Sequence, residues 1–241
     1  MIDLHCHILP GLDDGAREMD DAIALVRLAA EQGISRMVAT PHIQIGRFDN
    51  NLATIQAALS SLNEAIAPLD LGVDIRAGAE FRICPEVMML AERNELPFIG
   101  EYQGAKVLLL ELPHSQVPAG SDRLVDWLIR NNILPMIAHP ERNRELQAFP
   151  DRIRPFVRSG CLFQLTAASL VGDFGDVAMA LSERWLGEQL FTVIASDAHS
   201  EKRRPPKLAQ AFARAKELIG ETQALELVQQ RPCAISQSLF I

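Results

Sequence analysis

The chain has 241 residues, of which 48% are hydrophobic and 22% charged, as in an ordinary globular protein. Its net charge of −8 argues against nucleic-acid binding, so any anion must be held by a local cluster of Arg or Lys. No apolar run approaches the ~18 residues of a membrane span, and Asp3, His5 and His7 interrupt the N-terminus where a signal peptide would be apolar. We therefore expect a cytoplasmic protein without membrane insertion.

The cysteines argue against thiol chemistry. Cys6, Cys84, Cys161 and Cys233 form no C-x-x-C pair, and none is followed by an arginine at the C-x5-R spacing. A zinc knuckle, a redox pair and a cysteine-dependent phosphatase are therefore not expected, and we predict that the four thiols are small buried hydrophobes.

Short apolar segments alternate with helical patterns along the chain. The first helix carries Met19, Ile23, Val26 and Ala30 on one face and stops at Gly33. Alternation of this kind predicts parallel strands with right-handed crossovers. The seven predicted strands are Met1–Leu4, Arg36–Thr40, Val73–Ala79, Lys106–Leu110, Leu134–Ala138, Cys161–Leu165 and Phe191–Ala195. The further predicted helices are Asn50–Ala67, Pro85–Arg93, Ser121–Asn132, Asp151–Ser159, Asp176–Glu188, Pro206–Ile219 and Glu221–Gln230, the last closing before Pro232.

Histidines and carboxylates follow six of these seven strands. In a barrel all the strand ends would meet at one mouth, whereas an open sheet would spread them along an edge. The sequence shows no repeat and no linker, so we expect residues 1–241 to form one barrel-like α/β domain. The residues at the strand ends are His5, His7, His42, Glu80, Glu111, His139, Asp197 and His199.

This set of side chains predicts a metal site. His5 and His7 share one face of an extended strand, and five of the six histidines in the chain lie at strand ends. Imidazole and carboxylate ligands without thiolate suit Mn²⁺, Zn²⁺ or Fe, and suit Ca²⁺ poorly. Taken singly, His42 could be a loop histidine, and Glu111 could be paired with a buried arginine. The sixth histidine, His114, is expected at the rim without a role.

Two arginines predict that the site binds a phosphate. Arg142 lies on the His139 loop, and Arg204 ends the run Lys202-Arg203-Arg204 before Pro205-Pro206. Paired metals activate water and hold a phosphoryl group, whose outer oxygens need cationic donors. The alternatives are a salt bridge from Arg142 to Glu141 and an exposed basic patch. The residues alone thus indicate a multi-metal phosphoesterase.

Six ordered motifs, spread from Met1 to about Pro206, resemble the PHP (polymerase and histidinol phosphatase) superfamily. More closely, they resemble the manganese-dependent protein-tyrosine phosphatases of bacterial capsule and exopolysaccharide clusters. The motifs are His5-x-His7, Asp13-Asp14-Gly15, Thr40-Pro41-His42, Gly78-Ala79-Glu80, Ala138-His139-Pro140-Glu141-Arg142 and Ser196-Asp197-Ala198-His199.

The resemblance implies a distorted seven-stranded (β/α) barrel with up to three metal ions, Mn²⁺ foremost. It implies a metal-bound hydroxide or water as nucleophile, and phosphotyrosine on the tail of a partner kinase as substrate. Arg142 and Arg204 match the phosphate-contacting arginines, and Asp14 is grouped with them as a catalytic residue. The implied ligand sets are His5, His7, Glu80 and Asp197 for one metal, Glu80 as a bridge with Glu111 and His139 for a second, and Asp14, His42 and His199 for a third.

Two departures leave the substrate open. Ile43 stands where some relatives carry a second histidine, and the chain lacks a basic C-terminal tail. A small-molecule phosphatase resembling histidinol phosphatase and a non-catalytic, metal-stabilised scaffold are the alternatives. A nuclease or an amidohydrolase fits less well, because paired arginines suit a terminal phosphate. A homo-oligomer that associates through exposed helices of the barrel is also compatible with the sequence.

Overall fold

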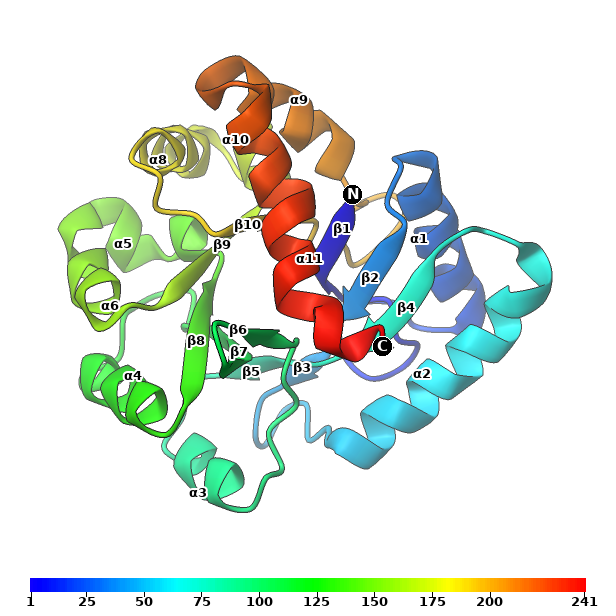
Figure 1. The fold of residues 1–241 in the computed structure, drawn as a ribbon, viewed down its shortest axis with the longest axis horizontal. Coiled ribbons are helices and arrows are strands. Elements are labelled where there is room, and N and C mark those ends of the chain that lie inside the picture. Colours follow the sequence, from blue (N-terminus) through cyan, green and yellow to red (C-terminus); the bar gives the residue numbers. More distant parts are fainter.

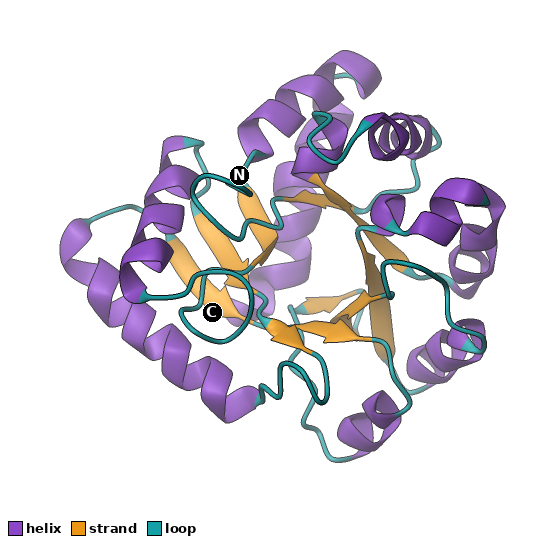
Figure 2. Cartoon of the chain, turned by 180° about the vertical axis from the view of Figure 1, so that it is seen from behind, coloured by secondary structure: helices purple, strands orange, loops and turns teal.

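The computed structural model describes all 241 residues, with the strands inside and the helices around them (Figures 1 and 2). Each of the seven predicted strands overlaps an observed one. The observed strands are β1 (Ile2–Cys6), β2 (Arg36–Ala39), β3 (His42–Ile43), β4 (Asp74–Ala77), β5 (Glu80–Arg82), β6 (Glu101–Tyr102), β7 (Ala105–Glu111), β8 (Ile133–Ala138), β9 (Leu162–Thr166) and β10 (Val193–Ala195).

Two helices, α2 and α5, begin at an asparagine whose side chain caps the first turn. Asn51 forms a capping box with Thr54 at the start of α2, for example. The helices are α1 (Met19–Glu31), α2 (Leu52–Ile66), α3 (Glu86–Glu92), α4 (Ser121–Arg130), α5 (Arg144–Ala148), α6 (Arg154–Ser159), α7 (Ala167–Leu170), α8 (Asp176–Gly187), α9 (Leu208–Ile219), α10 (Glu221–Leu225) and α11 (Arg231–Ser236), with short η turns between some of them. None of them has the length and apolar character needed to cross a bilayer.

Two mostly parallel sheets make up the inner layer. One has the order β1-β2-β4 and the other β10-β9-β8-β7-β5-β3, with β6 added as an antiparallel partner of β7. The sheets meet where Cys6 of β1 pairs in parallel with Ala198, just after β10. The arrangement is barrel-like, although the strand ladders form two sheets rather than one closed ring.

The structure has ten strands rather than the seven predicted, because β3 and β5 are short additional strands beyond the predicted ends at Thr40 and Ala79, and β6 was not predicted. Pro41 separates β2 from β3, and Gly78 and Ala79 separate β4 from β5. Proline donates no backbone hydrogen bond, but its carbonyl still accepts one from the Glu80 amide at 3.1 Å. His42 and Glu80, which both belong to the site, are the first residues after these two breaks.

Apolar side chains fill both the inside and the outside of the strand layer. An inner cluster includes Leu4, Val107 and Met136 together with Ile235 of α11. A larger outer cluster packs the strands against the helices. Gly100 lets α11 approach, since a Cβ at this residue would lie 2.0 Å from the Ile235 carbonyl oxygen. Helix α11 therefore crosses one end of the strand layer (Figure 1). The metal-ligand candidates lie at or just after the carboxyl ends of the predicted strands.

Two helix predictions were wrong in detail. The C-terminal helix does not close before Pro232: α10 passes through the π-helical turn Glu226–Gln230 into α11, with Pro232 in the first turn of α11. A first-turn proline gives up no intrahelical hydrogen bond, and the π turn accommodates the junction. The predicted helix Asp151–Ser159 begins instead as the 3₁₀ turn Pro150–Ile153 before α6.

Candidate metal centre

His5 and His7 form the floor of the site at the end of β1. Both side chains are fully buried, and their Nε2 atoms lie 3.1 Å apart. Cys6 between them packs into the outer core, as the alternation of a strand requires. The pairing of β1 with β2 is irregular between Asp3 and Cys6, and this irregularity is the point at which β1 turns the two imidazoles toward the site.

Glu80, the first residue of β5, lies at the centre of the cluster. Its Oε2 is 3.3 Å from Nε2 of both His5 and His7 and 2.9 Å from Nδ1 of His42. Its Oε1 is 2.7 Å from Nε2 of His139. Burial opposes the charged carboxylate, but the neighbouring histidines hold the pKa of Glu80 well below its usual value. One carboxylate thus bridges four imidazoles.

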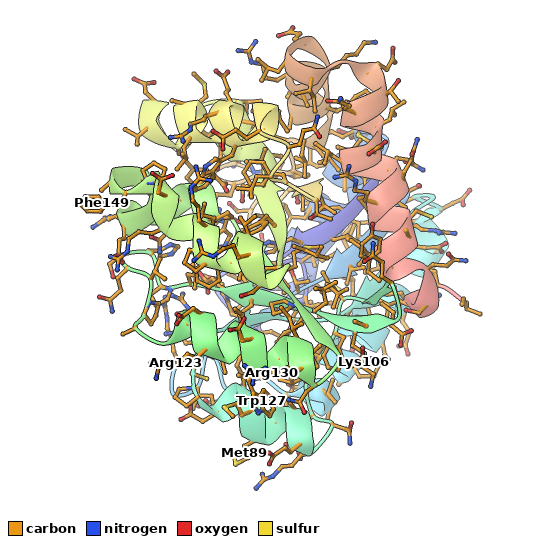
Figure 3. All side chains as sticks on the ribbon, turned by 60° about the vertical axis from the view of Figure 1, so that its left-hand side comes forward. Met89, Lys106, Arg123, Trp127, Arg130 and Phe149 are labelled. Carbon is orange, nitrogen blue, oxygen red and sulfur yellow. The ribbon has the colours of Figure 1, made fainter.

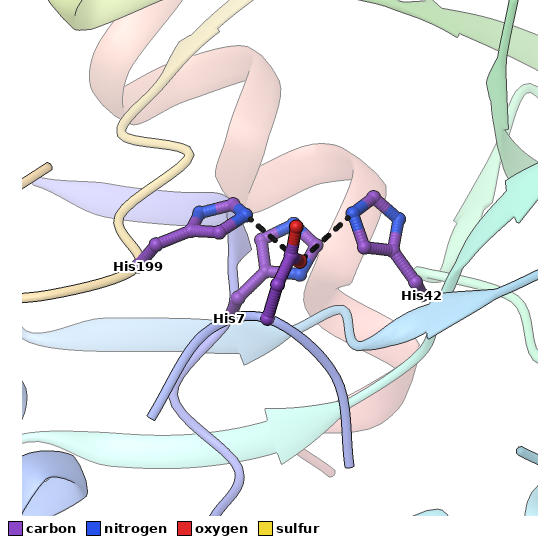
Figure 4. A group of neighbouring side chains, drawn as sticks. His7, His42 and His199 are labelled. Atoms are coloured by element: carbon purple, nitrogen blue, oxygen red, sulfur yellow. Dashed lines mark ion pairs between the residues drawn. The ribbon is translucent and has the colours of Figure 1, made fainter. Parts of the chain in front are cut away.

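Asp14 closes the outer side of the cluster. Its Oδ1 lies 3.4 Å from Nε2 of His42 and 3.6 Å from Nε2 of His199. The rings of His7, His42 and His199 converge on one small region (Figure 4). The Asp14 side chain is 48% exposed, whereas its partners are buried. Asp14 therefore separates the buried ligand candidates from solvent.

Glu111 ends β7 and faces both the cluster and an arginine. Its Oε2 lies 2.8 Å from Nε of Arg82 and 3.7 Å from Nδ1 of His42. Burial, reinforced by the charge of Glu80, raises the pKa of Glu111 to about 7. Sequence reasoning left open a buried arginine partner for Glu111 without identifying Arg82, which lies two residues after Glu80 in β5.

The histidines divide into two electrostatic groups. Burial disfavours charge on all of them, but the negative charge of Glu80 raises the pKa of His42 to about 9. Burial and the positive charge of Arg142 lower the pKa of His139 to about 3, and burial with the charge on His7 lowers that of His199 to about 4. His139 and His199 are therefore neutral at pH 7 with free lone pairs, the form that binds a metal.

Several buried polar atoms in the cluster have no hydrogen-bond partner. Such atoms are rare in proteins unless an ion or water satisfies them, and a set of imidazoles and carboxylates suits Mn²⁺, Zn²⁺ or Fe. The residues present therefore fit a metal centre. The unpartnered atoms are Nδ1 of His42, Oε2 of Glu80, Nε of Arg82 and Oε2 of Glu111, whose close ion-pair contacts with one another lack hydrogen-bond geometry.

The ligand candidates form four overlapping groups, and the grouping differs from the three sets that the resemblance implies. His7 joins the outer group beside Asp14, and His42 is shared between the outer group and the two glutamates. The four groups, each with its ligand atoms within 4.8 Å of one another, are His7–Asp14–His42–His199, His5–His7–Glu80, His5–His139–Asp197 and His42–Glu80–Glu111.

Two residues outside the predicted ligand set orient the histidines. Oδ2 of Asp13 lies 2.6 Å from Nδ1 of His7 and accepts the His42 amide hydrogen at 2.9 Å. Oε1 of Gln164 lies 3.0 Å from Nδ1 of His5 and accepts the amide hydrogen of His139 at 3.1 Å. Such partners fix which ring nitrogen is free to bind a metal. A glutamine inside an apolar strand was the available signal for Gln164.

A buried carboxylate fastens the two chain segments that meet at the site. Asp3 accepts hydrogen bonds from the hydroxyl and the amide of Ser196, at 2.5 and 2.9 Å. The following residue, Asp197, has φ of 52°, and His139 has φ of 32°. This left-handed region is unfavourable for residues other than glycine and is held only where the surroundings impose it.

Both predicted phosphate-binding arginines point to the same atom. The guanidinium of Arg142 contacts Oδ2 of Asp197, and NH2 of Arg204 donates to that same oxygen at 2.5 Å. Burial opposes a charged carboxylate, but His5 and the two arginines keep the pKa of Asp197 well below its usual value. Arg142 does not pair with Glu141, the alternative that the sequence left open, because Glu141 turns inward to accept the Ser169 hydroxyl at 2.7 Å.

His114 lies at the rim, as expected from the sequence. Its ring stacks at 6.3 Å from that of His139. Partial burial and the positive charges of Arg142 and Arg82 lower its pKa. His114 is therefore a neutral side chain beside the cluster.

A parallel, barrel-like α/β fold with clustered histidines and carboxylates at the strand ends is typical of metal-dependent hydrolases. The profile of the capsular polysaccharide synthesis family CpsB/CapC matches residues 1–237. The chain belongs to this family, and the resemblance seen in the motifs is confirmed.

Relatives of established name support the same assignment. The chain is 38% identical over 204 residues to the tyrosine-protein phosphatase YwqE of Bacillus subtilis. This alignment covers 85% of this chain and 79% of that protein. It is 34% identical over 212 residues to the putative tyrosine-protein phosphatase CapC of Staphylococcus aureus, covering 88% and 82%.

A solved structure has the same fold. A chain from the crystal structures of YwqE from Bacillus subtilis and CpsB from Streptococcus pneumoniae, described as unique metal-dependent tyrosine phosphatases, superposes with a TM-score of 0.91 at 34% identity, covering 98% of this chain and 94% of that one. The predicted class, a metal-dependent tyrosine phosphatase, is confirmed at the level of the family.

Proposed function

We propose that this protein hydrolyses phosphotyrosine on a protein substrate, using Arg142 and Arg204 to hold the phosphoryl group beside the metal centre. The observation that carries the proposal is the convergence of both guanidiniums on Oδ2 of Asp197. Each guanidinium has more N–H donors than this contact uses. The remaining donors can bind a tetrahedral phosphoryl group at the edge of the cluster.

The nine ligand candidates would hold up to three metal ions, of which Mn²⁺ is the one we favour. Bound metals supply Lewis-acid activation of water and neutralise charge on the phosphoryl oxygens. The proposed ligands are His5, His7, Asp14, His42, Glu80, Glu111, His139, Asp197 and His199, and their unpartnered buried atoms support this role.

The remaining roles belong to residues at the mouth. Arg142 and Arg204 would balance the charge that spreads over the outer oxygens as the ester bond breaks. Asp14, half-exposed at the outer side, would orient a water molecule entering there, and its exposure supports this role. A tyrosine leaving group has a pKa of about 10, so it departs without a strong general acid. The lowered pKa of His114 keeps this rim histidine neutral at pH 7, so it is not a protonated acid beside the leaving group.

The wider proposal concerns substrate and architecture. Membership of a capsular polysaccharide synthesis family supports a tyrosine-phosphorylated kinase of capsule or exopolysaccharide assembly as the partner. We also propose one domain built on a distorted seven-stranded barrel, in which β2 with β3 and β4 with β5 each occupy one strand position. The pairing of Cys6 with Ala198 across the two sheets supports that closure.

The test is phosphate release by metal-stripped protein to which Mn²⁺, Zn²⁺ or Mg²⁺ is restored, on matched phosphotyrosine and phosphoserine peptides. We expect turnover on phosphotyrosine, restored best by Mn²⁺. Arg204→Ala should lower kcat/KM by at least roughly tenfold, because a hydrogen bond to a charged group contributes about 1.5–3 kcal/mol. Arg203→Ala, one residue away and exposed, is the matched control.

Each contrary result has a definite meaning. Equal turnover of both peptides, or turnover of a small alkyl phosphate alone, would keep the hydrolase and reject the tyrosine assignment. No turnover with any metal would leave a metal-stabilised scaffold. Equal activity of the Arg203 and Arg204 variants would reject the phosphate-binding role.

A further inference from the structure

An aromatic side chain lies directly beside both phosphate-binding arginines. Phe174 belongs to the turn at residues 171–175, between α7 and α8, and is half-buried. The guanidinium carbon of Arg142 lies 4.3 Å from the centroid of its ring, and that of Arg204 lies 5.7 Å from it. Two cations from separate loops therefore lie over one aromatic ring, whose quadrupole attracts both.

The turn is built to hold this ring at the mouth. Gly172 and Gly175 flank it with φ of 89° and 87°, values that other residues rarely adopt. Asp173 forms an ion pair at 2.5 Å with Lys207, three residues after Arg204. The turn is thus tied to the segment that carries Arg204, so ring and guanidinium are positioned together.

The position of the ring relative to the arginines has a consequence for the substrate. An ester whose phosphoryl oxygens meet both guanidiniums carries its organic group on the ester oxygen, two bonds from the phosphorus. Aromatic rings attract each other when their centroids are about 4.5–7 Å apart. The two guanidinium carbons lie 4.3 and 5.7 Å from the centroid of Phe174, so a group held by both arginines lies beside this ring. An aryl group on the ester can therefore contact Phe174, whereas a short alkyl chain offers it no ring.

We propose that Phe174 is a specificity-determining residue that contacts the substrate ring and selects aryl phosphates over alkyl phosphates. The proposal rests on the phosphate-binding role of Arg142 and Arg204 given above. Phe48, the other aromatic ring at this end of the molecule, stacks on His42 at 5.5 Å and lies over Arg47. It contacts neither phosphate-binding arginine, so it is the less suitable partner for the substrate ring.

The experiment measures binding of phenylphosphonate and methylphosphonate, which are not hydrolysed, to the Mn²⁺-loaded protein by calorimetry. We expect the wild type to prefer phenylphosphonate. Phe174→Leu, which keeps apolar volume but has no ring, should reduce that preference by roughly three- to tenfold, the range for an aromatic pair. Phe174→Tyr should restore it. Phe149→Leu, at a 63% exposed ring on the periphery (Figure 3), is the matched control.

The outcomes separate this proposal from the proposed function. No preference in the wild type, or an unchanged preference in Phe174→Leu, overturns the role of Phe174 even if phosphotyrosine is hydrolysed. Equal losses for both phosphonates would show that the ring only supports the arginines, and loss of the preference in Phe48→Leu alone would transfer the role to Phe48. A Phe174-dependent preference without phosphotyrosine turnover would uphold this inference and reject the proposed function.

Discussion

Asp13 and His7 form one of the shortest polar contacts in the site, with 2.6 Å between Oδ2 and Nδ1. This contact keeps the proton on Nδ1 and leaves Nε2 of His7 directed at Glu80. Asp13→Asn retains the shape and removes the charge. We expect Mn²⁺ affinity to fall by roughly 10- to 100-fold, as for other carboxylates that support a histidine ligand. Calorimetric titration of the metal-stripped protein measures it.

The matched control for this change is Asp20→Asn on the exposed side of α1. Its metal affinity should equal that of the wild type. If Asp13→Asn binds Mn²⁺ as tightly as the control, Asp13 does not set the state of His7.

Gly15 lies so close to His7 that no side chain fits between them. A Cβ at this position would be 2.1 Å from the His7 carbonyl oxygen and 2.5 Å from its Cβ. Gly15→Ala must therefore push the Asp13–Asp14 turn away from β1. We expect the free energy of unfolding to fall by about 1–3 kcal/mol and Mn²⁺ binding to weaken. Urea denaturation with and without metal tests both.

Gly187→Ala is the comparison for that substitution, because a Cβ there meets open space. It should be neutral or slightly stabilising, since alanine favours a helix more than glycine does. Equal stabilities of the two alanine variants would contradict the close approach at Gly15.

The buried carboxyl of Glu141 should make the stability of the protein depend on pH. Burial raises its pKa from 4.5 to about 7, against which the Ser169 hydrogen bond acts. Between these values the folded protein keeps a proton that the unfolded chain has released, so this residue makes the protein less stable as pH rises from 4.5 to 7. Glu141→Gln removes that loss. Relative to wild type, the variant should gain up to roughly 3 kcal/mol on going from pH 4.5 to pH 8.

The measurement is urea unfolding of the metal-stripped protein at both pH values. Glu95→Gln, at an exposed position, serves as the control. A difference between wild type and Glu141→Gln that stays constant with pH would show that the buried carboxyl does not retain its proton.

Metal removal should lower the melting temperature, because the cluster holds carboxylates and imidazoles whose buried atoms lack partners. At a metal concentration 100 times Kd the folded state gains about 2.7 kcal/mol, which for a chain of this size corresponds to roughly 5–10 °C. Thermal unfolding with chelator and then with excess Mn²⁺ measures the change. Glu80→Gln should abolish most of it, whereas a full shift in that variant would contradict the central role of Glu80.

Sequence patterns located the strands and the side chains at their ends, because apolar runs and histidines are local features. They could not reveal Arg82 beside Glu111, or Gln164 between His5 and His139, because these contacts join strands that are distant in the chain. The same limit applies to Phe174, whose position depends on a turn between two helices. Pro232 was misread because the π turn before it has no local signature.

The site joins segments 193 residues apart in the chain, since Ser196 donates a hydrogen bond to Asp3 beside the pairing of Cys6 with Ala198. During synthesis His5 and His7 leave the ribosome long before Asp197 and His199, which follow about 190 residues later. The metal centre can therefore form only after the chain has been made as far as His199. A fragment ending before residue 197 would expose the buried carboxylates and imidazoles that the finished protein encloses.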